Sequence, residues 1–417
     1  MDKLVIEGGL PLHGDVRIAG SKNATLPLMA AAVIAPGQTV IQNVPRLVDI
    51  HTLGKVIAHL GVTVEHDDDK VVMDATATPS DTAPYDLVRK MRASFYMLGA
   101  LLARLGHAKV SMPGGCAWGP RPVDIHLKGL KALGASVELE GGYVLADSRQ
   151  MNGGRFVLDF PSVGATVNLL LAVSTLEKET ILENVAREPE ITNLIRMLNR
   201  MGARIEGANT SQLVILGSRD LKPLSFAVIP DRIEAGTYMA AVGRCGGDVM
   251  LRGADPEHLT MVLAKAAEAG IKFTVTTEGI RIQRENDLRS VDVETAVYPG
   301  FPTDMQAQWI ALMTAAAGVS LVTDTIYTDR FTHVAELMRL GAEIKMKGHT
   351  AKVYGPTQLT GAPVMSTDLR ASASLVIAAL AAKGRTDILR VYHLDRGYER
   401  LEDKFERIGA RIRREQE

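Results

Sequence analysis

Cys116 is the side chain best suited to chemistry, and it stands in a segment that favours neither helix nor strand. Glycines and prolines surround it in Met112–Pro122, and it is one of only two cysteines in 417 residues. Such residues are typical of a loop that can close over a ligand. A cation such as Arg121 favours the thiolate of a nearby cysteine, which can then act as acid, base or nucleophile. The alternative is a buried structural cysteine, which the polar loop disfavours.

Further cationic residues recur at two loop positions, one before an apolar helix and one after the following strand. Helix N-termini already favour anions, arginine binds phosphate or carboxylate through a planar fork, and lysine adds a point charge. We therefore expect a cationic cleft that binds small polyanions. Any one of these side chains alone could be a surface ion-pair partner, so the prediction depends on the recurrence of the positions. The residues are Lys22, Arg92, Arg121, Arg330, Arg370 and Arg396.

Two carboxylates stand among these cations at expected helix starts, Asp304 and Asp368. Aspartate at a helix start commonly caps the free backbone N–H groups. The other interpretation is a general base beside an anion site. The spacing alone leaves both interpretations open.

An internal repeat must position these loops. An apolar residue and a glycine end a helix, and a short alternating strand follows. The glycine is the left-handed residue that stops the helix, and six copies at intervals of 68 to 73 residues indicate a repeat. The six glycines are Gly61, Gly134, Gly202, Gly270, Gly341 and Gly409.

Each repeat also contains an earlier helix that is apolar on nearly every side, which predicts an interior helix. The unit is β-α-β-α-β-β, and three units closing around their helices, twice over, predict two similar inside-out α/β barrel domains. The polar stretch 217–231 is the expected second crossing, and periodicity does not decide which half holds the N-terminal strand. The interior helices are expected at 26–34, 95–105, 167–176, 238–242, 309–316 and 375–382.

Composition excludes several classes of function. Lys plus Arg is 47 and Asp plus Glu is 48, a net charge of −1, so binding to nucleic acid or insertion into a membrane is not expected. Two cysteines and no apolar leader of signal length predict a reducing cytoplasm. The histidines His126, His333 and His393 lack metal-ligand spacing, so we expect surface or helix-face histidines and no metal.

Nine segments of the chain together resemble the enolpyruvyl transferase family, in its branch that acts on UDP-N-acetylglucosamine. The resemblance implies two inside-out domains of three repeats each, one formed by 1–21 plus 230–417 and the other by 22–229. The segments are 20–24, 91–94, 113–116 (Pro-Gly-Gly-Cys), 121–124, 162–166, 186–190, 298–306, 367–372 and 395–400.

The resemblance also implies an activity. Phosphoenolpyruvate donates its enolpyruvyl group to the 3-hydroxyl of UDP-N-acetylglucosamine by addition and elimination, and phosphate is released, without a cofactor. This is the first committed step of peptidoglycan synthesis. Two alternatives remain: transfer to shikimate 3-phosphate, and a non-catalytic paralogue that binds the nucleotide sugar and regulates wall synthesis.

The family's site residues carry over to this chain by position. Cys116, Asp304 and Lys22 match catalytic residues: Cys116 protonates the methylene carbon of phosphoenolpyruvate and is alkylated by fosfomycin, and Asp304 accepts the hydroxyl proton. The implied phosphoenolpyruvate contacts are Lys22, Asn23, Arg121, Arg330, Asp368, Arg370 and Arg396. The implied nucleotide-sugar contacts are Arg92, Arg121, Pro122, Val123, Asp124, Ile125, Ser162, Val163, Gly164, Asp304 and Ile326.

Overall fold

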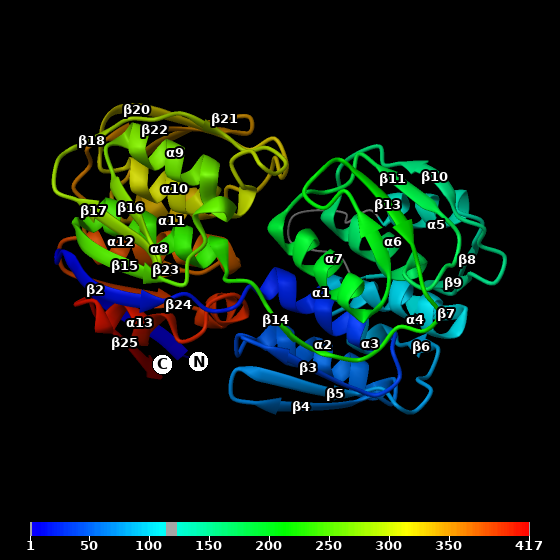
Figure 1. The fold of residues 1–417 in the computed structure, drawn as a ribbon. Coiled ribbons are helices and arrows are strands. Elements are labelled where there is room, and N and C mark those ends of the chain that lie inside the picture. The colour runs from blue at the N-terminus through cyan, green and yellow to red at the C-terminus, as the bar shows by residue number, and fades with distance from the viewer. Residues whose placement is uncertain (1, 114–122, 417) are drawn as a thin grey trace. The chain divides into compact units, whose positions relative to one another are not determined.

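The computed structural model describes residues 2–113 and 123–416 (Figure 1). The chain divides into two compact units, each with its own hydrophobic core. One unit combines Met1–Ala19 with Pro230–Glu417, and we call it the split unit. The other is Gly20–Ile229, the continuous unit.

The continuous unit contains three sheets of one topology, in which the first two strands are parallel and the other pairs are antiparallel. The first sheet has the order β14 (Ser225–Ala227), β3 (Gln38–Gln42), β5 (Lys70–Asp74), β4 (Thr63–Asp67). The second is β6 (Thr82–Ala83), β7 (His107–Ser111), β9 (Tyr143–Asp147), β8 (Ser136–Glu140). The third is β10 (Gly154–Val157), β11 (Thr180–Glu183), β13 (Gln212–Leu216), β12 (Arg204–Glu206).

The split unit repeats this topology. Its first sheet is β2 (Leu12–Arg17), β15 (Gly247–Arg252), β17 (Gly279–Arg284), β16 (Lys272–Thr276). The second is β18 (Leu288–Arg289), β20 (Ala316–Thr323), β22 (Thr350–Gly355), β21 (Glu343–Lys347), and β19 (Val293–Glu294) also pairs with β20. The third is β23 (Pro363–Met365), β24 (Arg385–Leu389), β1 (Asp2–Glu7), β25 (Arg411–Gln416).

Every sheet is accompanied by one interior helical segment and by at least one further helical segment. In the continuous unit the interior segments are α1 (Lys22–Ala32), η1 (Arg92–Tyr96) continuing into α4 (Met97–Leu105), and α6 (Val163–Val173). The others are α2 (Val48–His59), α3 (Tyr85–Val88), α5 (Asp124–Ala132) and α7 (Pro189–Met201). In the split unit the interior segments are α8 (Arg232–Cys245), η3 (Thr303–Met305) continuing into α10 (Gln306–Met313), and α12 (Leu369–Ala381). The others are η2 (Pro256–Leu259), α9 (Thr260–Ala269), α11 (His333–Arg339), η4 (Val391–Arg396) and α13 (Leu401–Arg407).

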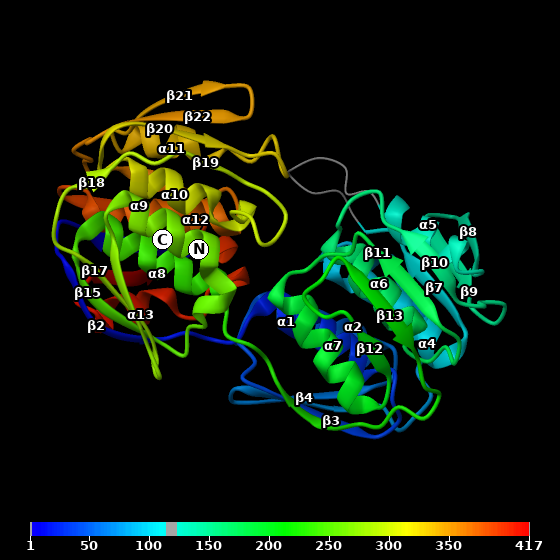
Figure 2. The same cartoon turned by 45° about the horizontal axis from the view of Figure 1, so that its top comes forward.

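The interior helices form the centre of each core, as the turned view in Figure 2 shows for α8, α10 and α12. In α6 every residue from Ala165 to Val173 is buried, and α12 is buried from Arg370 to Leu380. Close packing requires small residues at the crossings. A Cβ on Gly99 of α4 would lie 2.4 Å from the carbonyl oxygen of Asn168 on α6, so only glycine allows this approach. The prediction of interior helices in repeated α/β units is confirmed.

The six repeat glycines all have the left-handed conformation that the sequence predicts, with φ between 95° and 125°. Each follows the end of a helix and precedes a strand, as at Gly202 between α7 and β12. The local cause is that a side chain is strained at these angles, whereas glycine is not.

The N-terminal strand belongs to the later half of the chain. β1 lies between β24 and β25, with Ile6 opposite Thr386 on one side and Ile412 on the other. In the same way, β14 from the end of the continuous unit provides the first strand of that unit's first sheet. In the part of the chain that the structure describes, no helix has both the length and the apolar character needed to cross a membrane.

Candidate active site

The interior helices of the split unit start at acidic residues. Asp231 caps α8, and its Oδ1 accepts the backbone N–H groups of Ile233 and Glu234 at 2.8 and 3.2 Å. Asp368 caps α12 in the same way, accepting from Arg370 and Ala371 at 2.7 and 3.2 Å. The capping interpretation is therefore correct for Asp368.

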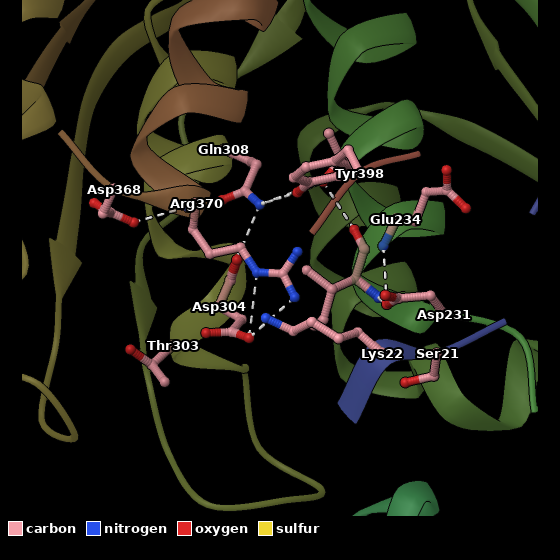
Figure 3. Close-up of polar contacts among 12 residues, drawn as sticks. Ser21, Lys22, Asp231, Glu234, Thr303, Asp304, Gln308, Asp368, Arg370 and Tyr398 are labelled. Atoms are coloured by element: carbon pink, nitrogen blue, oxygen red, sulfur yellow. Dashed lines mark hydrogen bonds and ion pairs between the residues drawn. The ribbon is translucent and has the colours of Figure 1, made fainter. Parts of the chain in front are cut away.

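Asp304 differs because its carboxylate is held by two arginines, Arg330 and Arg370, of which Figure 3 shows Arg370. It lies in the short turn η3, whose cap residue is Pro302. Its Oδ1 accepts from Nη1 of Arg330 at 2.8 Å, and its Oδ2 lies 3.3 Å from both Nε and Nη2 of Arg370. One carboxylate oxygen faces each guanidinium, so the group is oriented by two cations.

Both arginines are buried, with side-chain exposures of 12% for Arg330 and 2% for Arg370. Burial by itself would lower the pKa of a guanidinium. At Arg330, Asp304 and Asp368 outweigh burial and raise the pKa. At Arg370, Tyr398 and Asp304 do the same. The cluster therefore keeps its charges inside the protein, where they act strongly on a ligand.

A polar network supports Arg370 from behind. The hydroxyl of Tyr398 lies 2.8 Å from that of Thr237, and the Arg370 guanidinium carbon lies 5.4 Å from the centre of the Tyr398 ring. Gln308 donates to the backbone carbonyl of Asp304 at 2.9 Å and to Tyr398 at 3.3 Å. The sequence interpretation did not identify Gln308 or Tyr398, although Tyr398 belongs to the segment 395–400 that carries the family resemblance.

Two further candidates of the split unit flank this cluster. Arg396 ends η4, a segment that packs against α12, the helix that Asp368 caps. Burial and Arg396 lower the pKa of His393, whereas Asp368 raises it. Ile326 is half-buried in the loop that runs from β20 to Arg330. The structure thus groups Asp304, Arg330, Arg370, Asp368 and Arg396 at one end of the interior helices.

In the continuous unit, α1 begins with Ser21 as its cap and Lys22 as its first residue. Lys22 is buried, and its ammonium lies 3.2 Å from Oδ2 of Asp49 on α2. Asn23 is half-buried in the same turn. Asp49 was not among the sequence candidates, and its only sequence signal is an acidic residue in the first turn of a helix.

The start of α6 brings three other candidates together. Ser162 caps the helix and accepts the N–H of Ala165 at 3.3 Å. A Cβ on Gly164 would lie 3.1 Å from Nε2 of His126 and 4.0 Å from Nη2 of Arg92, so those side chains reach the exposed backbone of this first turn. The neighbouring candidates are Val163 in α6, Val123 before α5, and Asp124 and Ile125 in its first turn.

His126 is a buried residue, at 3% exposure. Asn168 accepts from the backbone N–H of Gly99 and donates to the carbonyl of Phe95, which fixes its amide, and its Nδ2 lies 2.8 Å from Nδ1 of His126. Nδ1 must therefore accept, which places the imidazole proton on Nε2. Within the described residues that Nε2 has no hydrogen-bond partner.

Burial, with a smaller contribution from Arg92, lowers the pKa of His126 to about 3, so the ring stays neutral. His333 on α11 is equally buried, and burial together with Arg330 lowers its pKa to about 3. Of the two expected placements, surface and helix face, the second is correct for both residues, because each lies on a helix with its side chain buried. No group of metal-ligating side chains occurs among the described residues.

Cys116, Arg121 and Pro122 lie outside the described residues. The described chain resumes at Val123, which is buried against the core of the continuous unit.

The fold, two units of three helix-centred α/β repeats, is that of the enolpyruvyl transferases. A model of the family described as EPSP synthase (3-phosphoshikimate 1-carboxyvinyltransferase) matches residues 6–405. The crystal structure of the enolpyruvyl transferase NikO from Streptomyces tendae matches with a TM-score of 0.89 at 27% identity, over 99% of this chain and 98% of that one. EPSP synthase from Acinetobacter baumannii shares the fold, with a TM-score of 0.79 at 18% identity over the whole of both chains.

Curated relatives narrow the assignment. UDP-N-acetylglucosamine 1-carboxyvinyltransferase from Desulfosudis oleivorans is 51% identical over 414 residues, 99% of each chain. The enzyme of the same name from Myxococcus xanthus is 51% identical over 420 residues, the whole of each chain. The chain therefore belongs to the enolpyruvyl transferase family, in the branch of the UDP-N-acetylglucosamine 1-carboxyvinyltransferases. This confirms the resemblance and the fold class predicted from the sequence.

Proposed function

We infer that this protein transfers the enolpyruvyl group of phosphoenolpyruvate to the 3-hydroxyl of UDP-N-acetylglucosamine and releases phosphate. The observation that carries the inference is the full-length match, at 51% sequence identity, to relatives named for this activity. The geometry adds a partly exposed carboxylate, Asp304, held between two arginines in the manner expected of a base beside an anion.

The reaction needs one base, one acid and a binding site for phosphate. In the addition step we assign Asp304 to take the proton of the 3-hydroxyl. The hydroxyl oxygen at the same time forms a bond to C2 of phosphoenolpyruvate. Cys116 gives a proton to C3, which becomes a methyl group. In the elimination step the Cys116 thiolate takes a proton back from C3, the C2–O bond to phosphate breaks, and the double bond is restored. The proton held by Asp304 leaves with the phosphate. Acid and base then return to their starting states.

Phosphoenolpyruvate is a compact polyanion, and cations that are already in position stabilise the charge that its phosphate gains on leaving. Lys22 is suited to this role because its ammonium is buried and oriented by Asp49. Arg330 and Arg370 are suited because burial keeps competing water away. We assign phosphoenolpyruvate to Lys22, Asn23, Arg121, Arg330, Asp368, Arg370 and Arg396.

The nucleotide sugar carries a diphosphate, which the exposed N-terminus of an interior helix can bind. The first turn of α6 places its backbone N–H groups beside Arg92 and the neutral ring of His126. We assign UDP-N-acetylglucosamine to Arg92, Arg121, Pro122, Val123, Asp124, Ile125, Ser162, Val163, Gly164, Asp304 and Ile326.

Two further assignments complete the proposal. Fosfomycin alkylates Cys116 and thereby removes the acid of the addition step. The protein acts in the cytoplasm, at the first committed step of peptidoglycan synthesis. Transfer to shikimate 3-phosphate is not supported, because the relatives at about half identity are named for the other acceptor and the EPSP synthase structures share only the fold.

Phosphate release from phosphoenolpyruvate tests the proposal, with UDP-N-acetylglucosamine and shikimate 3-phosphate as rival acceptors. We expect release only with the nucleotide sugar, and loss of release in Cys116→Ser and after fosfomycin. Release with shikimate 3-phosphate alone would move the protein to the sister activity. Binding of the nucleotide sugar without any release would indicate a regulatory paralogue.

A further inference from the structure

A buried carboxylate outside the assigned site joins the segments that carry three of its residues. Asp324 follows β20 and is fully buried. Its Oδ2 accepts the hydroxyl of Thr303 at 2.7 Å, directly before Asp304 in the chain. Its Oδ1 accepts the hydroxyl of Thr295 at 2.7 Å.

The same Oδ1 also holds the loop that leads to Arg330. It accepts the backbone N–H of Ile326 at 3.0 Å and that of Tyr327 at 2.9 Å. The far end of this loop returns to the same point, because Nη1 of Arg330 lies 3.4 Å from the hydroxyl oxygen of Thr303 and 2.8 Å from Asp304. The loop is thus tied to the Thr303–Asp304 turn at both ends.

The donors around Asp324 are two hydroxyls and two backbone N–H groups. All four need an acceptor, and a carboxylate provides enough lone pairs for all of them. Because the Thr303 hydroxyl donates to Asp324, its own lone pairs face Arg330. An asparagine of the same size would turn an amide N–H₂ toward these donors and leave part of the network unsatisfied.

We propose that Asp324 is a positioning residue that fixes the carboxylate of Asp304, the guanidinium of Arg330 and the Ile326 backbone relative to one another. This inference rests on the proposed function, in which Asp304 and Ile326 face the nucleotide sugar. A shift of about 1 Å in such a group costs about a hundredfold in rate. Asp324 therefore acts on the nucleotide sugar through Asp304 and Ile326, and on phosphoenolpyruvate only through Arg330, one of the seven residues assigned to that substrate. KM for the nucleotide sugar should respond more strongly for this reason.

The test compares Asp324→Asn with Asp292→Asn in the phosphate-release assay. Asp292 is the matched control, since it is exposed and accepts the N–H of Leu321 on the same sheet at 2.7 Å. For Asp324→Asn we expect kcat to fall about 10- to 100-fold and KM for UDP-N-acetylglucosamine to rise about tenfold, with KM for phosphoenolpyruvate changed less than about threefold. The Asp292→Asn kinetics should match the wild type.

A purely structural role would give a different result. It would reduce the amount of folded enzyme, so apparent kcat would fall while both KM values stayed at the wild-type level, and that outcome would overturn the inference. Unchanged kinetics in Asp324→Asn would overturn it as well. If the wild-type protein itself released no phosphate with UDP-N-acetylglucosamine, the proposed function would fail first, which is a separate and recognisable outcome.

A second pair of variants covers the case in which Asp324→Asn does not fold. Thr303→Val removes only the hydroxyl between Asp324 and Arg330 and leaves the other three bonds to Asp324 intact, whereas Thr303→Ser keeps that hydroxyl. We expect kcat about tenfold lower in the valine variant than in the serine variant. Equal kcat values in the two variants would also contradict the proposal.

Discussion

The two units differ in the residues that cap the N-termini of their interior helices. In the continuous unit the first and third interior helices are capped by the neutral hydroxyls of Ser21 and Ser162. In the split unit the equivalent caps are the carboxylates of Asp231 and Asp368, each accepting two backbone N–H groups. In both units the middle helix begins with a short 3₁₀ turn, which carries Arg92 in one and Asp304 in the other.

The difference decides how each unit meets an anion. A helix capped by serine keeps most of its positive N-terminal charge for a ligand. A helix capped by aspartate has already neutralised it, so an anion must be bound by side chains, here Arg330 and Arg370. A single fold thus supports two kinds of binding surface, and the chemistry lies in the helix starts rather than in the repeat.

The largest expected effect comes from removing the carboxylate charge of Asp304, at the start of the middle interior helix of the split unit. Asp304→Asn keeps the size of the side chain but removes the proposed base, so kcat should fall about a thousandfold. Calorimetric binding of UDP-N-acetylglucosamine should remain measurable. A kcat within tenfold of the wild type would mean that Asp304 is not the base.

The next effect is on stability. Arg370→Ala empties a buried position, since the Arg370 side chain is only 2% exposed, and takes one of two arginines from Asp304, which keeps Arg330. Emptying a buried position of this size costs about 2–5 kcal/mol. The melting temperature should drop strongly. Arg46→Ala is the control, because the ion pair of Arg46 with Asp68 is solvent-exposed and should contribute little. Equal melting temperatures for the two variants would refute this argument.

Replacing a neutral cap by an acidic one tests the comparison between the helix starts of the two units. Ser162→Asp gives α6 the kind of cap found on α12, so it should preserve the fold but repel the diphosphate. We expect KM for UDP-N-acetylglucosamine to rise about tenfold, equivalent to about 1.4 kcal/mol, and KM for phosphoenolpyruvate to stay the same. Ser162→Thr, which keeps a neutral hydroxyl, should behave like the wild type. An unchanged KM in the aspartate variant would show that the α6 start does not bind the anion.

The last effect is absent at neutral pH and grows only in acid, and a buried histidine in each unit is responsible for it. The folded-state pKa values of His126 and His333 are about 3, below the ordinary 6.5. Their stabilising contribution is therefore complete above about pH 6.5 and is lost as the pH falls toward 3, by up to about 1.4 kcal/mol per pH unit for each histidine.

Amide hydrogen exchange between pH 7 and 4 can follow each unit separately. His126→Phe should flatten the pH dependence in the continuous unit only, and His333→Phe in the split unit only. If either variant left its own unit as acid-sensitive as before, the neutral buried histidine would not be the cause.

Much of the fold follows from local sequence signals. A helix-stopping glycine such as Gly202 and an all-apolar helix such as α6 each depend on a few neighbouring residues, so the repeat was predictable. The pairing of the N-terminal strand with the later half of the chain was not predictable, because the repeat period does not indicate whether β1 pairs with β24 or with an early strand. That choice depends on tertiary contacts far along the chain.

The sequence indicated which residues belong to the candidate site, but not which of them pair with one another. Loop position indicated Asp304 and Arg370, but their ion pair joins residues 66 positions apart, and no local pattern encodes it. Asp49 and Asn168 were missed because each looks like an ordinary helix residue until its partner is known. The burial of His126 was not predictable from its helix position, because a polar residue on a helix usually faces water.

The position of β1 has a consequence for synthesis on the ribosome. Residues 2–7 emerge early, yet their sheet partners β24 and β25 lie at 385–389 and 411–416. The continuous unit contains all of its own strands and can fold as soon as it has emerged, since domains generally fold as units during translation. Until the last strand emerges, β1 has no sheet partner, and its apolar residues Leu4, Val5 and Ile6 stay uncovered. Chaperone dependence during translation should therefore centre on this short N-terminal segment.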